Sequence, residues 1–386
     1  MNTSQMQSAL ERAINNNDLL LLYQPKVCLL RGEVVGAEAL VRLRGDDSQI
    51  IAPNDFIPLA ERTGLLHDIT VSLLDQMVAA CQSIRKVRTG LSLSMNVAPN
   101  DLESHTISDR INHYLRQGSI EPIELEIEIT ESAAMGNVDT IAEDLERLSA
   151  MNIKLLMDDF GTGYSSIDRL SRLPFDCIKM DQGVVRRMGT SHQNMNVVKS
   201  AISMARELRM TSIAEGVESA GQYNFLIANG CEEAQGFYIA RPLALDEYKT
   251  FVTQPGSYEG SQIGRVHQAL YNVVHYRKCL IDATFCRSLN EDSILPSVVL
   301  PDVTELAEDS RFGVWYYGVG QRLNHMKSFQ DLQEPVEELH RLGHTFVELL
   351  SQGASHASLT RRFKEIDVCV DRIVSLLHTL ERDLLN

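Results

Sequence analysis

Acidic side chains interrupt the apolar, strand-like segments of this chain close to their carboxyl ends. Glu38 lies in ValGlyAlaGluAlaLeuValArg, and Glu128 lies in GluLeuGluIleGluIleThrGlu. Asp158 and Asp159 follow LysLeuLeuMet, and Glu215 follows ThrSerIleAla. A single acid at such a point is usually a helix N-cap or a solvated loop residue, but repetition on strand after strand favours one shared site. Several carboxylates at close range need a counter-charge, and oxygen-rich clusters suit Mg²⁺ or Mn²⁺.

The adjacent pair Asp158-Asp159 narrows the chemistry that such a cluster would perform. One of its carboxylates can bridge two metal ions, which is the arrangement used to cleave phosphoesters. Two amides stand at the ends of other strand-like runs: Asn96 after LeuSerLeuSerMet and Gln235 before GlyPheTyr. Their oxygens suit the same hard cations. The sequence therefore predicts a metal-dependent phosphodiester site.

Lys179, in CysIleLysMetAsp, is the only cation among these strand-end residues. One interpretation is a structural ion pair with Asp181 or Asp159. The other is a catalytic role, in which the ammonium orients or polarises the attacking water or offsets charge on the phosphoryl oxygens. The sequence leaves both interpretations open.

A glycine-containing segment, AspPheGlyThrGlyTyrSerSer (159–166), follows one strand-like run and precedes a helical segment. Its two glycines give a turn with free backbone amides, which suits a phosphate-binding or gating loop. A structural turn explains the glycines equally well. The functional interpretation depends on the two aspartates that introduce the segment.

Eight short apolar runs precede residue 240, and helical periodicity separates most of them. The runs are Leu19–Gln24, Val34–Leu43, Leu91–Val97, Ile123–Thr130, Lys154–Phe160, Cys177–Asp181, Thr211–Val217 and Glu233–Ile239, and the helical segments include Ile69–Ile84, Ile107–Arg116, Val138–Ala150 and Val197–Leu208. This alternation predicts a parallel sheet with right-handed crossovers and, at this size, a (β/α)8 TIM-like barrel. In a barrel the strand carboxyl ends share one rim, so the five acids would converge there. A doubly wound open sheet is the alternative.

One connection departs from this alternation. About ten residues, including Arg31-Gly32, separate the first two runs. That length is too short for a helical crossover and suits a hairpin. We therefore expect one antiparallel strand in the barrel.

Composition bounds the class of protein. The 386 residues carry a formal net charge of −16, which argues against a protein that coats nucleic acid by neutralising phosphates. Seven scattered cysteines, never spaced CxxC, favour reduced thiols in the cytoplasm over a disulfide scaffold. The polar amino terminus lacks a signal-peptide core, and no apolar stretch approaches the length of a membrane span. We expect a cytoplasmic protein without a membrane or nucleic-acid polymer as partner.

The last third of the chain has a different pattern. Residues 251–264 are rich in Gly, Ser and Pro and predict a linker. Long helical stretches follow at Gln262–Leu289, Val336–Gln352 and Leu359–Leu385. The expected organisation is therefore a barrel over residues 8–250, the linker, and an all-α helical bundle over residues 265–386.

At the strand ends the sequence resembles the EAL domain, the bacterial phosphodiesterase family for cyclic di-GMP. The resemblance covers residues ~8–250 and includes the signature Glu38-Ala39-Leu40. Its other motifs are TyrGlnPro (23–25), GluIleThrGlu (128–131), AspAspPheGlyThrGly (158–163), IleLysMetAsp (178–181), AlaGluGlyValGlu (214–218) and GlnGlyPhe (235–237). Because these motifs occur in order along a whole domain, the match is far more specific than any single motif.

The resemblance implies a barrel that binds two Mg²⁺ or Mn²⁺ ions and hydrolyses cyclic di-GMP to linear pGpG. By the family pattern, Glu38, Asn96, Glu128 and Asp158 match the ligands of one metal, and Asp158, Asp159 and Glu215 match those of the second. Glu215 also matches the general base, Lys179 the residue beside the hydrolytic water, Gln235 a residue that positions metal-bound water, and Glu131 the glutamate that holds the Asp-Phe-Gly loop. Gln24 and Arg42, with Asp181 and Glu218, match substrate-binding positions. None of these residues is missing, which favours an enzyme over a non-catalytic cyclic di-GMP receptor that signals through its helices.

The C-terminal region resembles the chemoreceptor zinc-binding domain. SerArgPheGlyValTrpTyrTyrGly (310–318), HisTyrArgLysCysLeu (275–280) and ProValGluGluLeuHisArgLeuGly (335–343) carry the resemblance. The family ligates zinc with three His and one Cys, but Ser310 stands at the Cys position and Val336 at one His position. This leaves His275 and His340 and implies a sensory or dimerising bundle, with a homodimer expected and its zinc site eroded.

A shifted alignment would pair His340 with His344, because i and i+4 lie on one helix face. That spacing is also common by chance, so an ordinary surface or core role stays open, as does a zinc-responsive switch. Trp315, the only tryptophan, is expected to anchor the core of this region.

Overall fold

The computed structural model describes residues 3–16, 19–45, 50–136, 138–161, 170–254, 258, 260–289 and 310–385. The chain divides into two compact units. The first comprises Met1–Tyr223 and Cys231–Tyr258, and the second comprises Asn224–Gly230 and Glu259–Asn386. Each unit is described by itself.

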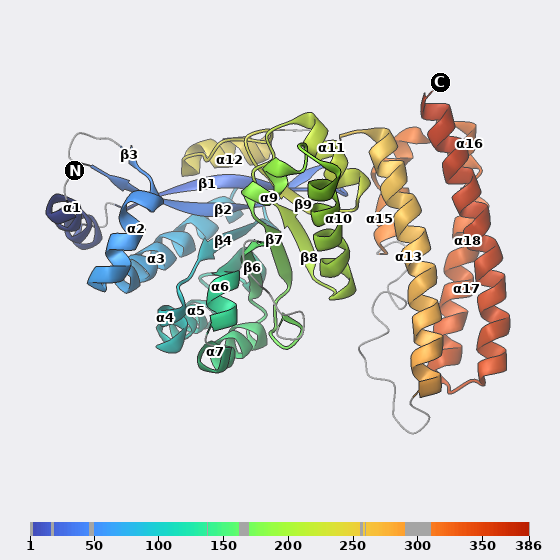
Figure 1. Ribbon diagram of the computed structural model, residues 1–386, viewed down its shortest axis with the longest axis horizontal. Helices are drawn as coiled ribbons and strands as arrows, with labels where there is room; N and C mark the ends of the chain where they lie inside the picture. The colour runs from blue at the N-terminus through green and yellow to red at the C-terminus, as the bar shows by residue number, and fades with distance from the viewer. Residues whose placement is uncertain are drawn as a thin grey trace. The chain divides into compact units, whose positions relative to one another are not determined.

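The first unit is a closed barrel surrounded by helices (Figure 1). Its strands are β1 (Leu19–Cys28), β2 (Glu33–Arg44), β4 (Ser92–Asn96), β5 (Leu125–Thr130), β6 (Lys154–Phe160), β7 (Cys177–Met180), β8 (Thr211–Ala214) and β9 (Glu233–Gln235). They pair in the order β1-β9-β8-β7-β6-β5-β4-β2, and β1 also pairs with β2, which closes the ring. The barrel prediction is confirmed and the open-sheet alternative is wrong, because both edges of the sheet find a partner.

β1 is the antiparallel strand that the short connection predicts. It runs opposite to both of its neighbours, β2 and β9. Its register places Gln24 opposite Glu38 on β2 and Lys26 opposite Gln235 on β9. The other neighbouring pairs around the ring, from β2–β4 to β8–β9, are parallel.

Helices connect the strands along most of the barrel. They are α1 (Thr3–Asn15), α2 (Pro53–Thr63), α3 (Leu66–Arg85), α4 (Pro99–Glu103), α5 (Thr106–Arg116), α6 (Glu131–Gly136), α7 (Val138–Ala150), α9 (Gln182–Arg187), α10 (His192–Glu207), α11 (Ala220–Ala228) and α12 (Leu245–Thr253). In α10, Val198, Ala201, Ile202 and Ala205 are buried, which is the i, i+3, i+4, i+7 spacing of one helix face. The Ser191 side chain caps this helix by accepting a hydrogen bond from the Asn194 amide at 3.2 Å.

The strand ends differ from the sequence prediction where local backbone chemistry intervenes. The predicted run Ile123–Thr130 begins with a short 3₁₀ helix, η1 (Pro122–Glu124), fixed by a 2.9 Å bond from the Glu121 amide to the Glu124 carboxylate. β8 stops before Gly216 (φ +63°) and β9 stops before Gly236 (φ +154°), so both are shorter than predicted. A two-residue strand, β3 (Ile50–Ile51), extends the β2 edge and has no counterpart in the prediction.

The second unit contains three long helices, α13 (Gln262–Leu289), α17 (Gln333–Ser351) and α18 (His356–Leu385), which Figure 1 shows running alongside one another. Shorter elements complete it: α15 (Arg311–Tyr317), η2 (Val319–Leu323) and α16 (Lys327–Gln330). Trp315 is fully buried, and its ring lies 5.7 Å from Phe312 and 5.8 Å from Phe329, so it is the core anchor that the sequence predicts. In the predicted linker, 251–264, α12 continues to Thr253 and α13 begins at Gln262. Over the described residues, the structure has no helix both long and apolar enough to cross a membrane.

Candidate active site

Lys179 lies at the centre of the predicted acid cluster. Its ammonium nitrogen is 2.5 Å from a Glu128 oxygen, 2.6 Å from Glu215, 3.1 Å from Asp158 and 3.6 Å from Glu38. The lysine side chain is fully buried. Glu38, Glu128 and Asp158 lie on β2, β5 and β6, and Glu215 directly follows β8. The structural alternative predicted an ion pair with Asp181 or Asp159, but the observed carboxylate partners are these four.

Strand register explains why residues so far apart in sequence meet. On β4, β5 and β6, Asn96 is opposite Glu128, and Thr130 is opposite Asp158. Side chains alternate between the two faces of a strand, and those that point inward at the carboxyl ends share one layer of the barrel interior. The acid at each strand end thus reaches the same rim, as the barrel prediction requires.

Two amides link the carboxylates at this rim. The Asn96 side chain donates to Glu38 at 3.3 Å and to Glu128 at 3.4 Å. The Gln235 side chain donates to the other oxygen of Glu38. These bonds hold Glu38 from both sides and leave the amide oxygen of Gln235 buried, without a hydrogen-bond partner among the described residues.

Burial and mutual repulsion make the acids reluctant to ionise together. Burial, and then the charge of Glu38, raise the pKa of Glu128 to about 8. Burial raises the pKa of Glu215 well above its ordinary value, even though Lys179 opposes it. Burial alone would lower the pKa of Lys179, but the surrounding carboxylates outweigh it and raise that pKa. One ammonium is thus too little counter-charge for the cluster.

The donor set fits a hard divalent cation. Carboxylate and amide oxygens are the ligands that Mg²⁺ and Mn²⁺ take, and Glu128 also has one buried oxygen without a hydrogen-bond partner among the described residues. No three His, Cys, Asp or Glu side chains in the described part of the chain are arranged as a ready-made metal site. Lys179 holds the carboxylates instead, so a cation would compete with its ammonium for them.

Asp159 is set apart from the other acids by a bulge in β6. The β6–β7 register shifts between Met157 and Phe160, and Asp159 has a left-handed backbone (φ +57°). The Asp159 amide donates to the Asp158 carboxylate at 2.9 Å, while its own side chain is exposed. Partial desolvation of the carboxylate by neighbouring protein atoms, and then the charge of Asp158, raise the pKa of Asp159. The bulge thus brings two adjacent carboxylates to the rim from one strand.

Glu131 connects the end of β5 to the segment after β6. This side chain is buried at the start of α6, and its carboxylate accepts a hydrogen bond from the Gly161 amide at 3.0 Å. The contact matches the role that the resemblance implies for it. Most of the predicted phosphate-binding or gating loop, residues 162–166, lies outside the described residues.

The four predicted substrate-binding residues each make a different contact. Gln24 is buried and donates to the Ala240 carbonyl at 3.3 Å. Arg42 donates to the Val41 carbonyl at 2.8 Å. Asp181 caps α9 by accepting from the Gly183 amide at 2.9 Å, and exposed Glu218 lies 3.5 Å from Arg186.

The sequence analysis missed a second buried ion pair within the barrel. Lys26 is fully buried and contacts the Glu126 carboxylate and the Ser94 hydroxyl, the latter at 3.3 Å. Glu126 precedes Glu128 by two residues, so the same strand supplies an acid to both clusters. The period of two in GluLeuGluIleGlu, together with Lys26 two residues after Gln24, was the signal that could have revealed it.

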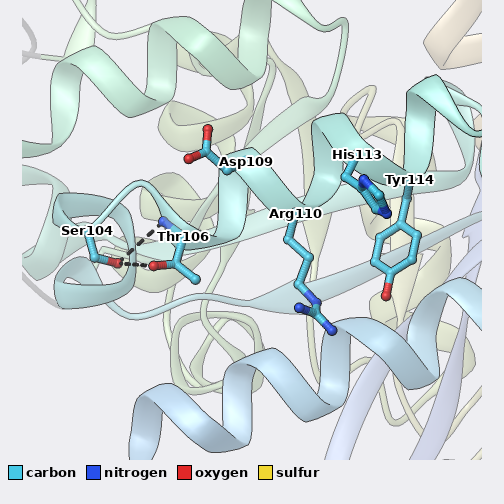
Figure 2. Close-up of a pocket in the computed structure, with 6 residues that line it drawn as sticks. All are labelled: Ser104, Thr106, Asp109, Arg110, His113 and Tyr114. Carbon is cyan, nitrogen blue, oxygen red and sulfur yellow. Dashed lines mark hydrogen bonds between the residues drawn. The ribbon is translucent and has the colours of Figure 1, made fainter.

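A hollow of about 510 Å³ on α5 is lined by none of the predicted residues. Figure 2 shows its lining, with Ser104 and Thr106 hydrogen-bonded to each other and Arg110 and Tyr114 on neighbouring turns. Arg110 and Tyr114 both bond Asp75, and Asp109 pairs with Arg147. Because these charges already have partners, the hollow offers little to attract a charged ligand.

The candidate zinc residues of the bundle have separate surroundings. The His275 ring lies 3.6 Å from the Cys279 sulfur, and exposed His344 lies 3.7 Å from Glu348. His340 packs at 6.1 Å from the Tyr317 ring, and burial lowers its pKa to about 4. They belong to no cluster of three potential ligands among the described residues.

The two positions where zinc ligands were expected to be lost have structural roles here. The Ser310 hydroxyl accepts a hydrogen bond from the Gly313 amide at 2.9 Å and so caps α15. Val336 is completely buried. Ser310 thus stabilises a helix end, and Val336 packs in the core of the bundle.

Comparison with known proteins assigns the barrel to a family. Residues 7–242 match the model of the EAL domain. Since this is more than half of the chain, the chain belongs to the EAL domain family. The barrel, the acid-lined rim and the intact motifs are thus properties of one family.

Similar proteins in the family are named for their activities. The chain is 36% identical over 252 residues to the cyclic di-GMP phosphodiesterase NbdA of Pseudomonas aeruginosa, covering 64% of this chain and 32% of that protein. It is 35% identical over 234 residues to the cyclic di-GMP phosphodiesterase PdeR of Escherichia coli, covering 61% and 35%. A solved structure of the PaMucR phosphodiesterase in a c-di-GMP complex superposes with a TM-score of 0.59 at 35% identity, covering 63% of this chain and 99% of that one. The chain spans about a third of the length of the two curated relatives.

Replacing Lys179 by Met should destabilise the protein in the presence of a chelator, because four buried carboxylates lose their ammonium. We expect the free energy of unfolding to fall by about 3–5 kcal/mol at pH 8. The loss should shrink towards pH 5, where carboxyls with raised pKa values become neutral. Added Mn²⁺ should restore the variant more than it stabilises the wild type. Thermal unfolding with EDTA or Mn²⁺ at both pH values measures this.

The matched control is Lys86→Met, which removes an exposed lysine from the same unit. It should change neither the unfolding temperature nor its response to Mn²⁺. Equal protection of Lys179→Met and wild type by Mn²⁺ would contradict competition between Lys179 and a cation.

His340 should make the bundle less stable in acid. Its pKa is about 4 when folded but near 6.5 when unfolded, so the unfolded state binds more protons between these values and stability falls as pH drops. His340→Gln should lose this part of the pH dependence. Trp315 is the only tryptophan and lies in the bundle, so its fluorescence in denaturant titrations reports this unit.

His344→Gln is the control, because His344 lies one turn further along α17 with a side chain 71% exposed. Its profile between pH 4 and 6.5 should match the wild type. If His340→Gln also matches the wild type, burial of that imidazole does not set the acid sensitivity.

Proposed function

We propose that this chain hydrolyses cyclic di-GMP to linear pGpG, using divalent cations held at the barrel rim. The observation that carries the proposal is the convergence of Glu38, Glu128, Asp158 and Glu215 on Lys179. Relatives named as cyclic di-GMP phosphodiesterases, and the PaMucR complex with c-di-GMP, support the substrate. The acid set is complete, which favours hydrolysis over binding alone.

The carboxylates and Asn96 would hold two Mg²⁺ or Mn²⁺ ions. The ligands would be Glu38, Asn96, Glu128, Asp158, Asp159 and Glu215. The ions would supply positive charge that stabilises the phosphoryl oxygens and makes a water more acidic. With that charge present, the acids whose pKa values are raised in its absence can all ionise.

The remaining side chains act on the water and the phosphodiester. Glu215, whose carboxylate lies 2.6 Å from the Lys179 ammonium, is the base that accepts the proton of the attacking water. The Gln235 amide oxygen has no other partner in the described structure and accepts a hydrogen bond that orients the water. Lys179 offsets charge on the phosphoryl oxygens. In-line attack breaks the bond to the 3′ oxygen, which leaves and takes a proton from solvent.

We further infer that the bundle regulates the barrel and that the chain acts as a homodimer. We also infer that it works in the cytoplasm, where its six described cysteines would stay as free thiols. A chain shortened to residues 1–254 should differ from the full chain in turnover and should elute at a smaller oligomeric mass. Circular dichroism checks that the shortened barrel is folded. Identical kinetics in the two chains would argue against regulation.

Glu38→Gln should lower the turnover of cyclic di-GMP in Mg²⁺ at least about 100-fold. The substitution removes the negative charge of a proposed metal ligand, the carboxylate that the Asn96 and Gln235 amides hold in place. Glu215→Ala should do the same by removing the base. Chromatographic analysis of pGpG measures turnover, and thermal unfolding checks that both variants fold.

Glu33→Gln is the matched control, since Glu33 lies on the same strand as Glu38 but at its exposed start. It should retain wild-type turnover. Wild-type rates in Glu38→Gln would refute the proposed site. Tight binding of cyclic di-GMP by the wild type without pGpG would instead identify a receptor.

A further inference from the structure

A cation and an aromatic ring form an exposed pair just beyond β9. The guanidinium carbon of Arg241 lies 4.3 Å from the centre of the Phe237 ring. Phe237 is 51% exposed, although burial of a phenylalanine side chain normally stabilises a fold. Among the described residues, Arg241 makes no ion pair or hydrogen bond. Its donors are therefore available to a ligand.

Backbone contacts fix the pair beside the acid cluster. Gly236 packs so closely on Val217 that a Cβ at this position would lie 2.2 Å from the Val217 nitrogen. The Val217 amide donates to the Gln235 carbonyl at 3.1 Å, and the Tyr238 amide donates to the Val217 carbonyl at 2.9 Å. Phe237 is thus held between the segment that carries Glu215 and the strand that ends at Gln235.

The same loop is joined to β1. Gln24 donates to the Ala240 carbonyl, the residue immediately before Arg241. The Ala240 amide donates to the Gly236 carbonyl at 3.1 Å and closes the turn that contains Phe237. The pair is therefore part of a rigid turn tied to three segments that bear site residues, and it needs no rearrangement to meet a ligand at the rim.

We propose that Phe237 and Arg241 form a subsite for one guanine base of the substrate. The ring holds the guanidinium by cation–π attraction and fixes its plane. Arg241 then donates two hydrogen bonds to the O6 and N7 atoms of guanine, which adenine cannot accept because it carries an amino group at position 6. Phe237 adds a stacking surface for the base. This inference rests on the proposed function, since the cyclic dinucleotide supplies the guanine.

The test measures binding separately from hydrolysis. Isothermal titration in EDTA gives the dissociation constants of cyclic di-GMP and cyclic di-AMP without turnover. Arg241→Met should weaken cyclic di-GMP binding about 10- to 100-fold and leave cyclic di-AMP nearly unchanged, so discrimination between the two falls. Phe237→Ala should act in the same direction, and Arg241→Lys should rescue little, because an ammonium cannot form the two-pronged contact.

Tyr238→Ala is the matched control. Tyr238 is the adjacent aromatic residue and is 42% exposed, but its ring packs 5.3 Å from Tyr223. The control should keep wild-type affinity and discrimination. With Mn²⁺ present, hydrolysis of bis(4-nitrophenyl) phosphate, which has no base, should be unaltered in Arg241→Met and Phe237→Ala.

The outcomes separate the two proposals. If Arg241→Met and Phe237→Ala keep the wild-type dissociation constants and discrimination, the subsite is refuted while the proposed function stands. If the wild type binds and discriminates through Arg241 but forms no pGpG, the proposed hydrolysis fails while the subsite stands. A wild type that binds neither dinucleotide and also forms no pGpG with Mn²⁺ overturns both.

Discussion

The barrel rim depends on a single electrostatic balance between Lys179 and the acids around it. Four carboxylates from four strands share one ammonium in a site from which water is largely excluded. Without that charge, their mutual repulsion would favour protonation of some of them. The amides of Asn96 and Gln235 add the hydrogen bonds that keep Glu38 in place. Stability at the rim thus depends on how this excess of negative charge is neutralised.

The barrel interior continues this charge pattern below the rim. Lys26 and Glu126 form a buried pair one step deeper along the strands. Leu156, Cys177 and Ile213, each two residues before a rim residue, form a buried apolar cluster. An ion pair in such a place contributes little net stability over an apolar pair, but removing one partner alone is costly. The deeper pair therefore restricts which residues the interior tolerates and links β1 to β5 across the barrel interior.

The sequence was most informative where periodicity and repetition acted together. Alternation of apolar runs predicted the barrel, and the short connection at Arg31-Gly32 predicted the reversed strand. The acids at successive strand ends predicted the rim. The partners of Lys179 were not predictable, because they depend on the register between strands that no local pattern encodes. Likewise, the early ends of β8 and β9 follow from glycine backbone angles at Gly216 and Gly236.

The site was harder to predict in its outer parts. The pairing of Phe237 with Arg241 depends on a turn closed by contacts to β1 and to Val217, which are distant in sequence. In the bundle, the resemblance drew attention to His275, His340 and His344, whereas the structure gives each histidine a different neighbour. Spacing along a helix predicts a shared face but not the residue that lies opposite.

The reversed direction of β1 has a consequence for how this barrel can be built into larger proteins. Leu19, the first residue of β1, pairs with Leu43 near the carboxyl end of β2, so the chain enters the barrel at the end where the acids gather. In an all-parallel barrel the first strand starts at the opposite end. A module fused ahead of β1 would therefore be tethered close to the mouth, and a short tether gives it a high local concentration there. The strand reversal makes the acid-lined end of the barrel the natural attachment point for a module in the same polypeptide.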